Sequence, residues 1–112
     1  YTRSSGLEVP HQVQAASEVA NILLHRSRSN TGVLLTVPIP VEAELDAAQL
    51  DSVLAQALID CDAAEIRGAA VTPFVLGRIG QATEGRSVPA NLALAENNAR
   101  VAAQVAVAIA DC

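Results

Sequence analysis

The sequence predicts an α/β protein that is rich in helix and contains one or two buried strands. Four stretches carry apolar residues at helical spacing, and three of them begin at a helix start signal. A continuous apolar run, GVLLTVPIP over residues 32–40, is typical of a strand buried on both faces of a parallel sheet. Because such a strand needs neighbours to bond its backbone, we expect the chain to be one segment of a larger α/β protein.

The first part of the chain should contain a single helix. Residues 2–10 read as a loop of small polar residues, and HQVQ at residues 11–14 could form a short strand. Apolar side chains recur at helical spacing within residues 17–29, which predicts the first helix. Asn30 and Gly32 supply the signal that should end it.

The three later helices have recognisable start signals. Asp46 should cap the second helix, with Gln49 as its capping-box partner. Thr72 should cap the third helix, with Pro73 in its first turn. Ser87 should cap the last helix, which then runs through an alanine-rich stretch toward the end of the sequence.

Two of these helices have a clear apolar face. The stripe expected to be buried on the second helix consists of Leu50, Val53, Leu54, Ala57, Leu58 and Cys61. The third helix should bury Phe74, Ile79 and either Val75 or Leu76, and should end near Gly85.

Composition narrows the classes of function. The net charge is −5, all seven basic residues are arginines, and only the HRSRS stretch at residues 25–29 groups them, which argues against a nucleic-acid surface. We interpret this stretch as a solvated helix end. No apolar run is long enough for a membrane span, and the first residues do not resemble a signal peptide. These features indicate a soluble protein of the cytoplasm.

Most chemistry-bearing residues have a simpler explanation than catalysis or metal binding. Cys61 lies on an apolar stripe and should pack as a small hydrophobe, and Cys112 should be a loose thiol. His11 and His25 have no evident catalytic partner, and no Cys or His pair has the spacing of a zinc site. We therefore expect no metal ligand in this chain.

The acidic stretch EAELD and the start of the third helix are weaker candidates. Glu42, Glu44 and Asp46 could in principle perform acid–base chemistry, but their position between a Pro-Ile-Pro turn and a capped helix favours a solvated loop. Thr72 and Pro73 open a helix that could hold an anion, although a plain N-cap explains them better.

Three asparagines interrupt the last apolar helix. Asn97 and Asn98 lie in its middle, where an amide costs a few tenths of a kcal/mol relative to alanine. We expect a structural role for this pair, and in particular that Asn98 ties the helix to a neighbouring loop. Asn91 lies near the start of the helix, where polar ligands gather, and its amide could both donate to and accept from the edge of a nucleobase. Asn91 is therefore the candidate ligand-binding residue.

Four motifs in order resemble the C-terminal third of the pseudouridine-5′-phosphate glycosidases, the family that includes indigoidine synthase A proteins. They are YTRSSG at 1–6, GVLLTVPIP at 32–40, IRGAAVTPFVLGRI at 66–79 and ANLALAENNARVAAQVA at 90–106. EGRS at 84–87 is similar to the family's entry into its last helix. The match runs over nearly the whole of residues 1–112, which would then be the C-terminal part of a single domain.

The resemblance implies a fold, an activity and an assembly. The fold would be an α/β/α sandwich, assembled as a homotrimer. The enzyme would reversibly cleave the C–C glycosidic bond of pseudouridine 5′-phosphate to uracil and ribose 5-phosphate, through a Schiff base on a lysine. A glutamate would assist proton transfer, and manganese or another divalent metal would be bound by residues upstream of this chain.

This chain contains no lysine, and an arginine cannot form a Schiff base. The resemblance therefore implies that the catalytic residues lie upstream and that the chain alone is inactive. Asn91 matches the family's substrate-contacting asparagine and would bond the uracil edge. Val37 departs from the family's usual asparagine, which leaves the substrate preference open. The alternatives are a non-catalytic copy acting as an assembly or binding module, and an indigoidine-pathway enzyme acting on a related phosphosugar adduct.

Overall fold

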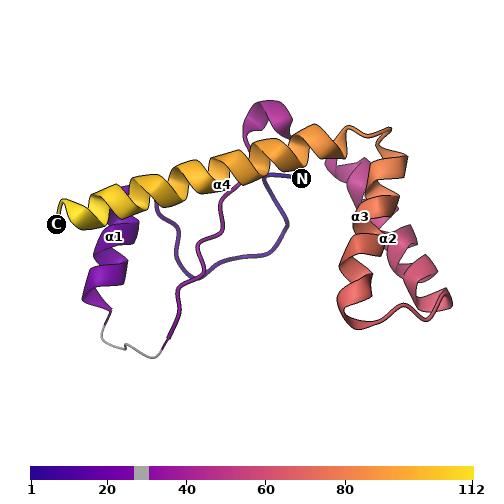
Figure 1. The fold of residues 1–112 in the computed structure, drawn as a ribbon, viewed down its shortest axis with the longest axis horizontal. Helices are drawn as coiled ribbons and strands as arrows, with labels where there is room; N and C mark the ends of the chain where they lie inside the picture. Colours follow the sequence, from indigo (N-terminus) through magenta and orange to yellow (C-terminus); the bar gives the residue numbers. More distant parts are fainter. Residues whose placement is uncertain (27–30) are drawn as a thin grey trace.

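The structure, a computed structural model, describes residues 1–26 and 31–112. One long helix, α4 (Ser87–Ala110), runs along most of the longest dimension of the molecule (Figure 1). A second helix, α1 (Ala16–His25), packs against α4 near its C-terminal end. The helical hairpin of α2 (Ala47–Ala63) and α3 (Val71–Ala82) lies at the opposite end of α4. Between these two ends, the N-terminal residues and the chain after residue 31 follow the middle of α4.

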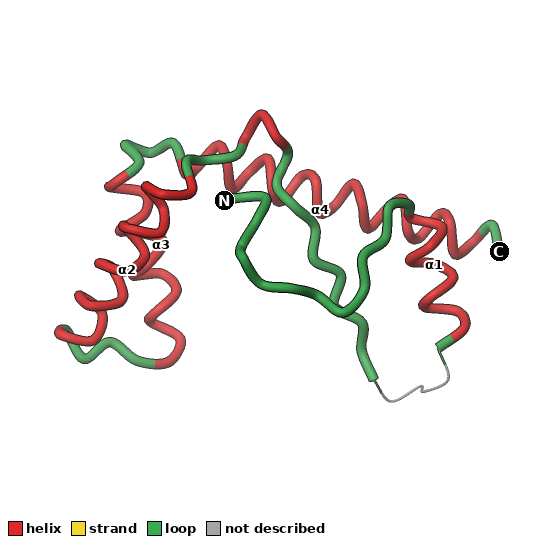
Figure 2. The backbone as a smooth tube through the Cα atoms, turned by 180° about the vertical axis from the view of Figure 1, so that it is seen from behind, coloured by secondary structure: helices red, strands yellow, loops and turns green. Residues whose placement is uncertain are grey.

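The predicted buried strand is not formed. The described residues contain helix, turn and loop but no β-ladder, and residues 31–40 run as irregular chain (Figure 2). The side chain of Leu34 is 89% exposed, so the prediction of a strand buried on both faces is wrong for this structure. A strand forms only where a neighbouring strand accepts and donates its backbone hydrogen bonds, and the described residues supply none. The tentative strand at residues 11–14 is absent for the same reason.

The first helix is shorter than predicted. Helix α1 ends at His25, and Arg26 already has extended backbone angles, with ψ at 129°. The predicted stop at Asn30 and most of the basic HRSRS stretch lie outside the described residues. At the other end of α1, Glu18 accepts hydrogen bonds from the backbone N–H groups of Gln14 at 2.6 Å and Ala15 at 2.9 Å. These two amides precede the helix and have no carbonyl partner within it.

The start of α2 confirms one half of the predicted capping box. The Asp46 carboxylate accepts from the backbone N–H of Gln49 at 2.7 Å, as an N-cap does. The Gln49 side chain does not return to the Asp46 backbone. It donates instead to the carbonyl of Ala82 at 3.4 Å and accepts from Arg86 at 3.2 Å. Gln49 therefore links α2 to the junction of α3 and α4.

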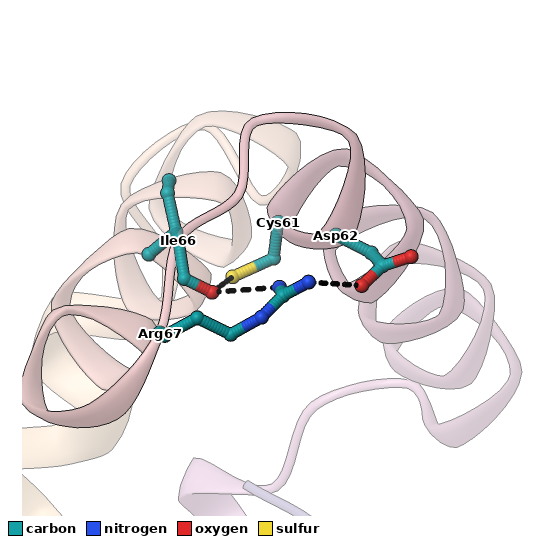
Figure 3. Close-up of polar contacts among 4 residues, drawn as sticks. All are labelled: Cys61, Asp62, Ile66 and Arg67. Atoms are coloured by element: carbon teal, nitrogen blue, oxygen red, sulfur yellow. Dashed lines mark hydrogen bonds and ion pairs between the residues drawn. The ribbon is translucent and has the colours of Figure 1, made fainter.

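The second helix ends in a Schellman motif. The N–H of Ile66 donates to the carbonyl of Cys61 at 3.0 Å, and the N–H of Glu65 donates to that of Asp62 at 3.0 Å. Glu65 has a left-handed φ of 53° in the position that usually holds glycine. Arg67 then bonds Asp62 at 2.8 Å and the Ile66 carbonyl at 3.1 Å, while the Cys61 thiol also donates to that carbonyl at 3.7 Å (Figure 3). This cluster fixes the turn between α2 and α3.

The prediction that Thr72 caps the third helix is wrong. A short 3₁₀ helix, η2 (Gly68–Ala70), leads directly into α3, so that helical geometry already begins at Val71. Thr72 is consequently an exposed residue of the first turn, and Pro73 lies in that turn as predicted.

The junction of α3 and α4 is built around a buried threonine. The Thr83 side chain is 1% exposed; its hydroxyl donates to the carbonyl of Ile79 at 2.8 Å and accepts from the N–H of Ser87 at 3.2 Å. Ser87 is therefore the first residue of α4 rather than its cap, because Thr83 satisfies the amide there. The third helix ends at Ala82, and the N–H of Gly85 closes its last turn by donating to Gly80 at 2.9 Å.

The apolar core is small. Of the stripe predicted for α2, Leu50, Ala57 and Cys61 are buried, whereas Leu54 and Leu58 remain 40% and 50% exposed. On α3, Ile79 is buried as predicted, whereas Phe74 and Val75 are only half-buried and Leu76 is 43% exposed. None of the helices within the described residues has the length and apolar character needed to cross a membrane.

Candidate functional site

A groove of about 540 Å³ lies between the middle of α4 and the chain that enters the short 3₁₀ helix η1 (Val41–Ala43). The residues that line it are Arg3, Val37, Pro38, Pro40, Glu42, Ala93, Glu96, Asn97, Arg100 and Val101. One wall is therefore the Pro-Ile-Pro loop and the other is a face of α4. Two arginines and two glutamates give the groove no net charge.

The loop wall is held by side chains from distant parts of the sequence. Asn97 donates through Nδ2 to the carbonyl of Pro38 at 3.1 Å. Arg3 donates through Nη1 to the next carbonyl, that of Ile39, at 2.7 Å, and Ile39 itself is 1% exposed. The backbone N–H of Arg3 also donates to the carboxylate of Glu44 at 2.7 Å. The N-terminal residues and α4 thus hold the loop from two sides.

Asn97 is itself held by a neighbouring charge. Arg100, one turn further along α4, donates through Nη2 to Asn97 Oδ1 at 2.6 Å, a length typical of a charge-assisted bond. Its other terminal nitrogen donates to Gln104 at 3.4 Å. Because the guanidinium occupies the carbonyl end of the Asn97 amide, the NH₂ end is directed to the loop.

The structure assigns the loop-tying role to Asn97 rather than to Asn98. Asn98 is exposed and makes no side-chain hydrogen bond within the described part of the chain. The specific prediction for Asn98 is therefore wrong, while a structural role for the amide pair holds at Asn97. Position along the helix explains the difference, since adjacent residues project about 100° apart and only one of them can face the loop.

Asn91 lies on α4 four residues after its first residue, Ser87, and its side chain is exposed. It does not line the groove. Seven residues separate it from Asn98, which is close to two helical turns, so these two amides share one face of α4. The structure therefore presents Asn91 and Asn97 in different directions. Asn91 remains available to a group approaching from outside this chain.

The remaining candidates are not brought together into a site. His11 is exposed, and His25 Nδ1 lies 3.0 Å from the Asn21 carbonyl of its own helix. Cys61 is buried as predicted, and Cys112 is exposed and donates to the Ala108 carbonyl at 3.1 Å. Glu42 and Glu44 are exposed, and nowhere in residues 1–26 and 31–112 do three His, Cys, Asp or Glu side chains gather as a metal would require.

A second hollow, of about 410 Å³, lies between α2 and α3. Arg78 crosses its rim, where it pairs with Asp60 at 3.3 Å and lies 5.1 Å from the ring centre of Phe74. Both contacts of Arg78 are made inside the hairpin. Most of the residues that line the hollow are small or exposed residues of the two helices. This hollow reads as a packing feature of the hairpin.

Sequence reasoning missed three residues of the groove: Arg3, Asn97 as a loop contact, and Arg100. Arg3 lies 36 residues before the carbonyl that it bonds, and Asn97 lies 59 residues after its partner. No local pattern reports contacts at that separation. The one available signal was the Asn97–Arg100 spacing of three residues, which places two polar side chains side by side on a helix.

The fold of this chain is similar to part of a solved enzyme structure. Over 96% of its length the chain matches the crystal structure of the prealnumycin C-glycosynthase AlnA in complex with ribulose 5-phosphate, with a TM-score of 0.80 and 29% sequence identity. The match covers 36% of that enzyme. The helices described above therefore correspond to one continuous share of a larger fold.

The chain belongs to the family of indigoidine synthase A like proteins, whose family model matches residues 1–108. A pseudouridine-5′-phosphate glycosidase from Caldanaerobacter subterraneus subsp. tengcongensis is 41% identical over 96% of the chain, and one from Herpetosiphon aurantiacus is 45% identical over 97%. The chain spans 36% and 37% of the length of these two relatives. The resemblance on which the family was predicted is confirmed.

Proposed function

We propose that this chain forms the C-terminal third of a full-length pseudouridine-5′-phosphate glycosidase. The observation that carries the proposal is the match of 96–97% of the chain to glycosidases of which it spans only 36–37%. The full-length enzyme would act in the cytoplasm and would reversibly split pseudouridine 5′-phosphate into uracil and ribose 5-phosphate. Residues 1–112 would be the C-terminal part of its single domain.

The exposed apolar run supports this proposal. Leu34 is 89% exposed, Val33 47% and Leu35 37%, within a stretch whose residues favour strand. Water-exposed apolar side chains in a row are typical of a surface that another part of the protein covers. We infer that residues 32–37 complete a sheet of the α/β/α sandwich in the full-length enzyme, which would then assemble as a homotrimer.

The bond-breaking chemistry would be supplied by residues outside this chain. A Schiff base requires a primary amine side chain, and the chain contains no lysine. Likewise, the residues that the structure describes contain no group of three or more His, Cys, Asp or Glu side chains placed to hold a metal ion. We propose that the lysine, the proton-transferring glutamate and the ligands of a divalent metal all lie upstream of residue 1.

The contribution of this chain would be to bind and orient the substrate. Asn91 is exposed on the first half of α4, where its amide can donate one hydrogen bond to a uracil edge and accept another. Such a contact is made equally in the ground state and in the transition state. It would therefore lower KM more than it raises kcat.

The test is a uracil-release assay on the full-length enzyme with pseudouridine 5′-phosphate. We expect turnover in the full-length protein, none in the 112-residue chain alone, and a KM raised roughly tenfold by Asn91→Ala, which removes one to two ordinary hydrogen bonds. An unchanged KM in Asn91→Ala would remove that residue from the site. The absence of uracil release from the full-length protein would refute the proposed activity as a whole.

One observation favours a related second function. The matched crystal structure is that of a C-glycosynthase, an enzyme that by its name forms a C-glycosidic bond, in complex with ribulose 5-phosphate. The full-length enzyme that contains this chain would then form a C-glycosidic bond rather than break one, or would join the sugar phosphate to an acceptor other than uracil. Incubating the full-length protein with ribose 5-phosphate and either uracil or an aromatic acceptor distinguishes the two functions by the product that accumulates.

A further inference from the structure

The Pro-Ile-Pro loop has more backbone hydrogen-bond acceptors than donors. Pro38 and Pro40 have no N–H group, so the loop offers three carbonyl acceptors but a single N–H donor, that of Ile39. Each of its three carbonyls is nevertheless bonded: Pro38 by the Asn97 side chain, Ile39 by the Arg3 side chain, and Pro40 by the N–H of Ala43 at 3.0 Å. Only the first of these bonds comes from α4.

The bond from Asn97 joins the two features on which the proposed function depends. Pro38 follows directly after residues 32–37, the proposed sheet strand. Asn97 lies six residues after Asn91, which is about 9 Å along the same rigid helix. The contact between Asn97 Nδ2 and the Pro38 carbonyl therefore fixes the position of α4 along its own axis relative to the proposed strand, and with it the position of Asn91.

Arg100 makes this contact directional. An unrestrained asparagine amide can rotate to exchange its oxygen and nitrogen ends, and only one orientation presents a donor to the loop. The 2.6 Å bond from Arg100 to Oδ1 selects that orientation.

We propose that Asn97, oriented by Arg100, is a positioning residue that aligns Asn91 with the rest of the substrate site. The proposal rests on the proposed function, because Asn91 is assigned there to the uracil edge. In this proposal Asn97 does not itself bind the substrate. Its effect on catalysis passes through the placement of α4.

The experiment compares the full-length wild-type enzyme with four new variants and with Asn91→Ala. Asn97→Ala removes the bond to the Pro38 carbonyl, and Asn98→Ala is the matched control, since the neighbouring amide is exposed and makes no contact within the described residues. Asn97→Asp is a second disruption that keeps the side-chain size and the pairing with Arg100 but presents no donor to the loop. The double variant Asn91→Ala with Asn97→Ala tests whether both changes raise the KM through the loss of the same substrate contact.

We expect Asn97→Ala and Asn97→Asp to raise the KM for pseudouridine 5′-phosphate roughly two- to tenfold, the factor carried by one net hydrogen bond, with kcat little changed. Asn98→Ala should match the wild type. The double variant should have the KM of Asn91→Ala alone, because a misplaced Asn91 and a missing Asn91 lose the same contact.

Three results would overturn the proposal while leaving the proposed function intact. These are an unchanged KM in both Asn97 variants, an equal effect of Asn98→Ala, or effects of Asn91→Ala and Asn97→Ala that multiply in the double variant. A multiplying effect would mean that Asn97 supports the fold in general rather than Asn91. A wild-type enzyme that releases no uracil would instead refute both the proposed function and the positioning role.

Discussion

The α3–α4 junction and the segment over residues 31–40 solve the same problem by different means. Both contain irregular backbone that needs hydrogen-bond partners. At the junction the partners are close in sequence, since the Thr83 hydroxyl bonds Ile79 and Ser87, each four residues away. In the segment over 31–40 the side chains that bond the carbonyls of Ile39 and Pro38 are distant, with Arg3 at 36 residues and Asn97 at 59.

The two regions also differ in how far their side chains are buried. Thr83 at the junction is 1% exposed, whereas Leu34 in the extended segment is 89% exposed. At the junction, the buried Thr83 hydroxyl finds its hydrogen-bond partners in α3 and α4. In the segment over residues 31–40, Pro38 and Ile39 are held by side chains distant in the sequence, and the preceding Val33 and Leu34 are 47% and 89% exposed. The comparison indicates that the junction is held by local contacts, whereas the apolar residues Val33 and Leu34 are left exposed, as the proposed sheet of the full-length enzyme would require.

The largest effect that we expect is on stability, when Leu34 in the exposed segment is replaced. In the full-length enzyme, Leu34→Ala should lower the free energy of unfolding by about 2–5 kcal/mol, because the residue would be buried in the sheet core. In the 112-residue chain the same change should have almost no effect, since the side chain is already in water. Urea denaturation of both forms measures the difference. Equal effects in the two forms would show that residues 32–37 do not join a sheet.

The same contrast explains which features the sequence could predict. The Asp46 cap, the first turn with Pro73 and the burial of Cys61 are all encoded within a few residues, and the structure confirms them. The strand over residues 32–40 depends on partners elsewhere, so its residue preferences alone could not establish it. Asn97 was misassigned in favour of Asn98 because the choice depends on where a distant loop meets the helix.

The junction should in turn be sensitive to a single hydroxyl. Thr83→Val keeps the shape of the side chain but leaves the Ser87 N–H without its acceptor in a buried place. We expect a loss of about 1–3 kcal/mol in the free energy of unfolding, the usual cost of an unsatisfied buried polar group. Thr83→Ser retains the hydroxyl and should lose less. If thermal unfolding of the two variants coincided, the hydroxyl would not be the group that matters.

The end of α2 offers a smaller effect of opposite sign. Glu65 adopts a φ of 53°, which an L-residue with a side chain reaches only at a cost. Glu65→Gly should therefore stabilise the protein by about 1 kcal/mol, since glycine adopts this conformation freely in the Schellman motif. The matched control is Asp62→Ala, which removes the exposed pair with Arg67 and should change the stability by less than about 1 kcal/mol. Destabilisation by Glu65→Gly would mean that its side chain makes a contribution larger than the strain.

The smallest effect concerns pH and the start of α1. The backbone N–H groups of Gln14 and Ala15 bond the Glu18 carboxylate and lower its pKa from the ordinary value of 4.5. A lowered pKa in the folded state means that the charged form stabilises the fold. This contribution is fully present above the unfolded-state pKa and is lost as the pH falls through the folded-state pKa. The first turn of α1 should therefore loosen at acidic pH below 4.5.

Carboxyl titration followed by NMR, together with the amide shifts of Gln14 and Ala15, measures this effect directly. Glu18→Gln is the matched control, because an amide keeps one acceptor oxygen but cannot titrate. In that variant the two amide shifts should no longer follow a common titration with a midpoint below 4.5. A midpoint at or above the ordinary value in the wild type would contradict the bonding of Glu18 at the helix start.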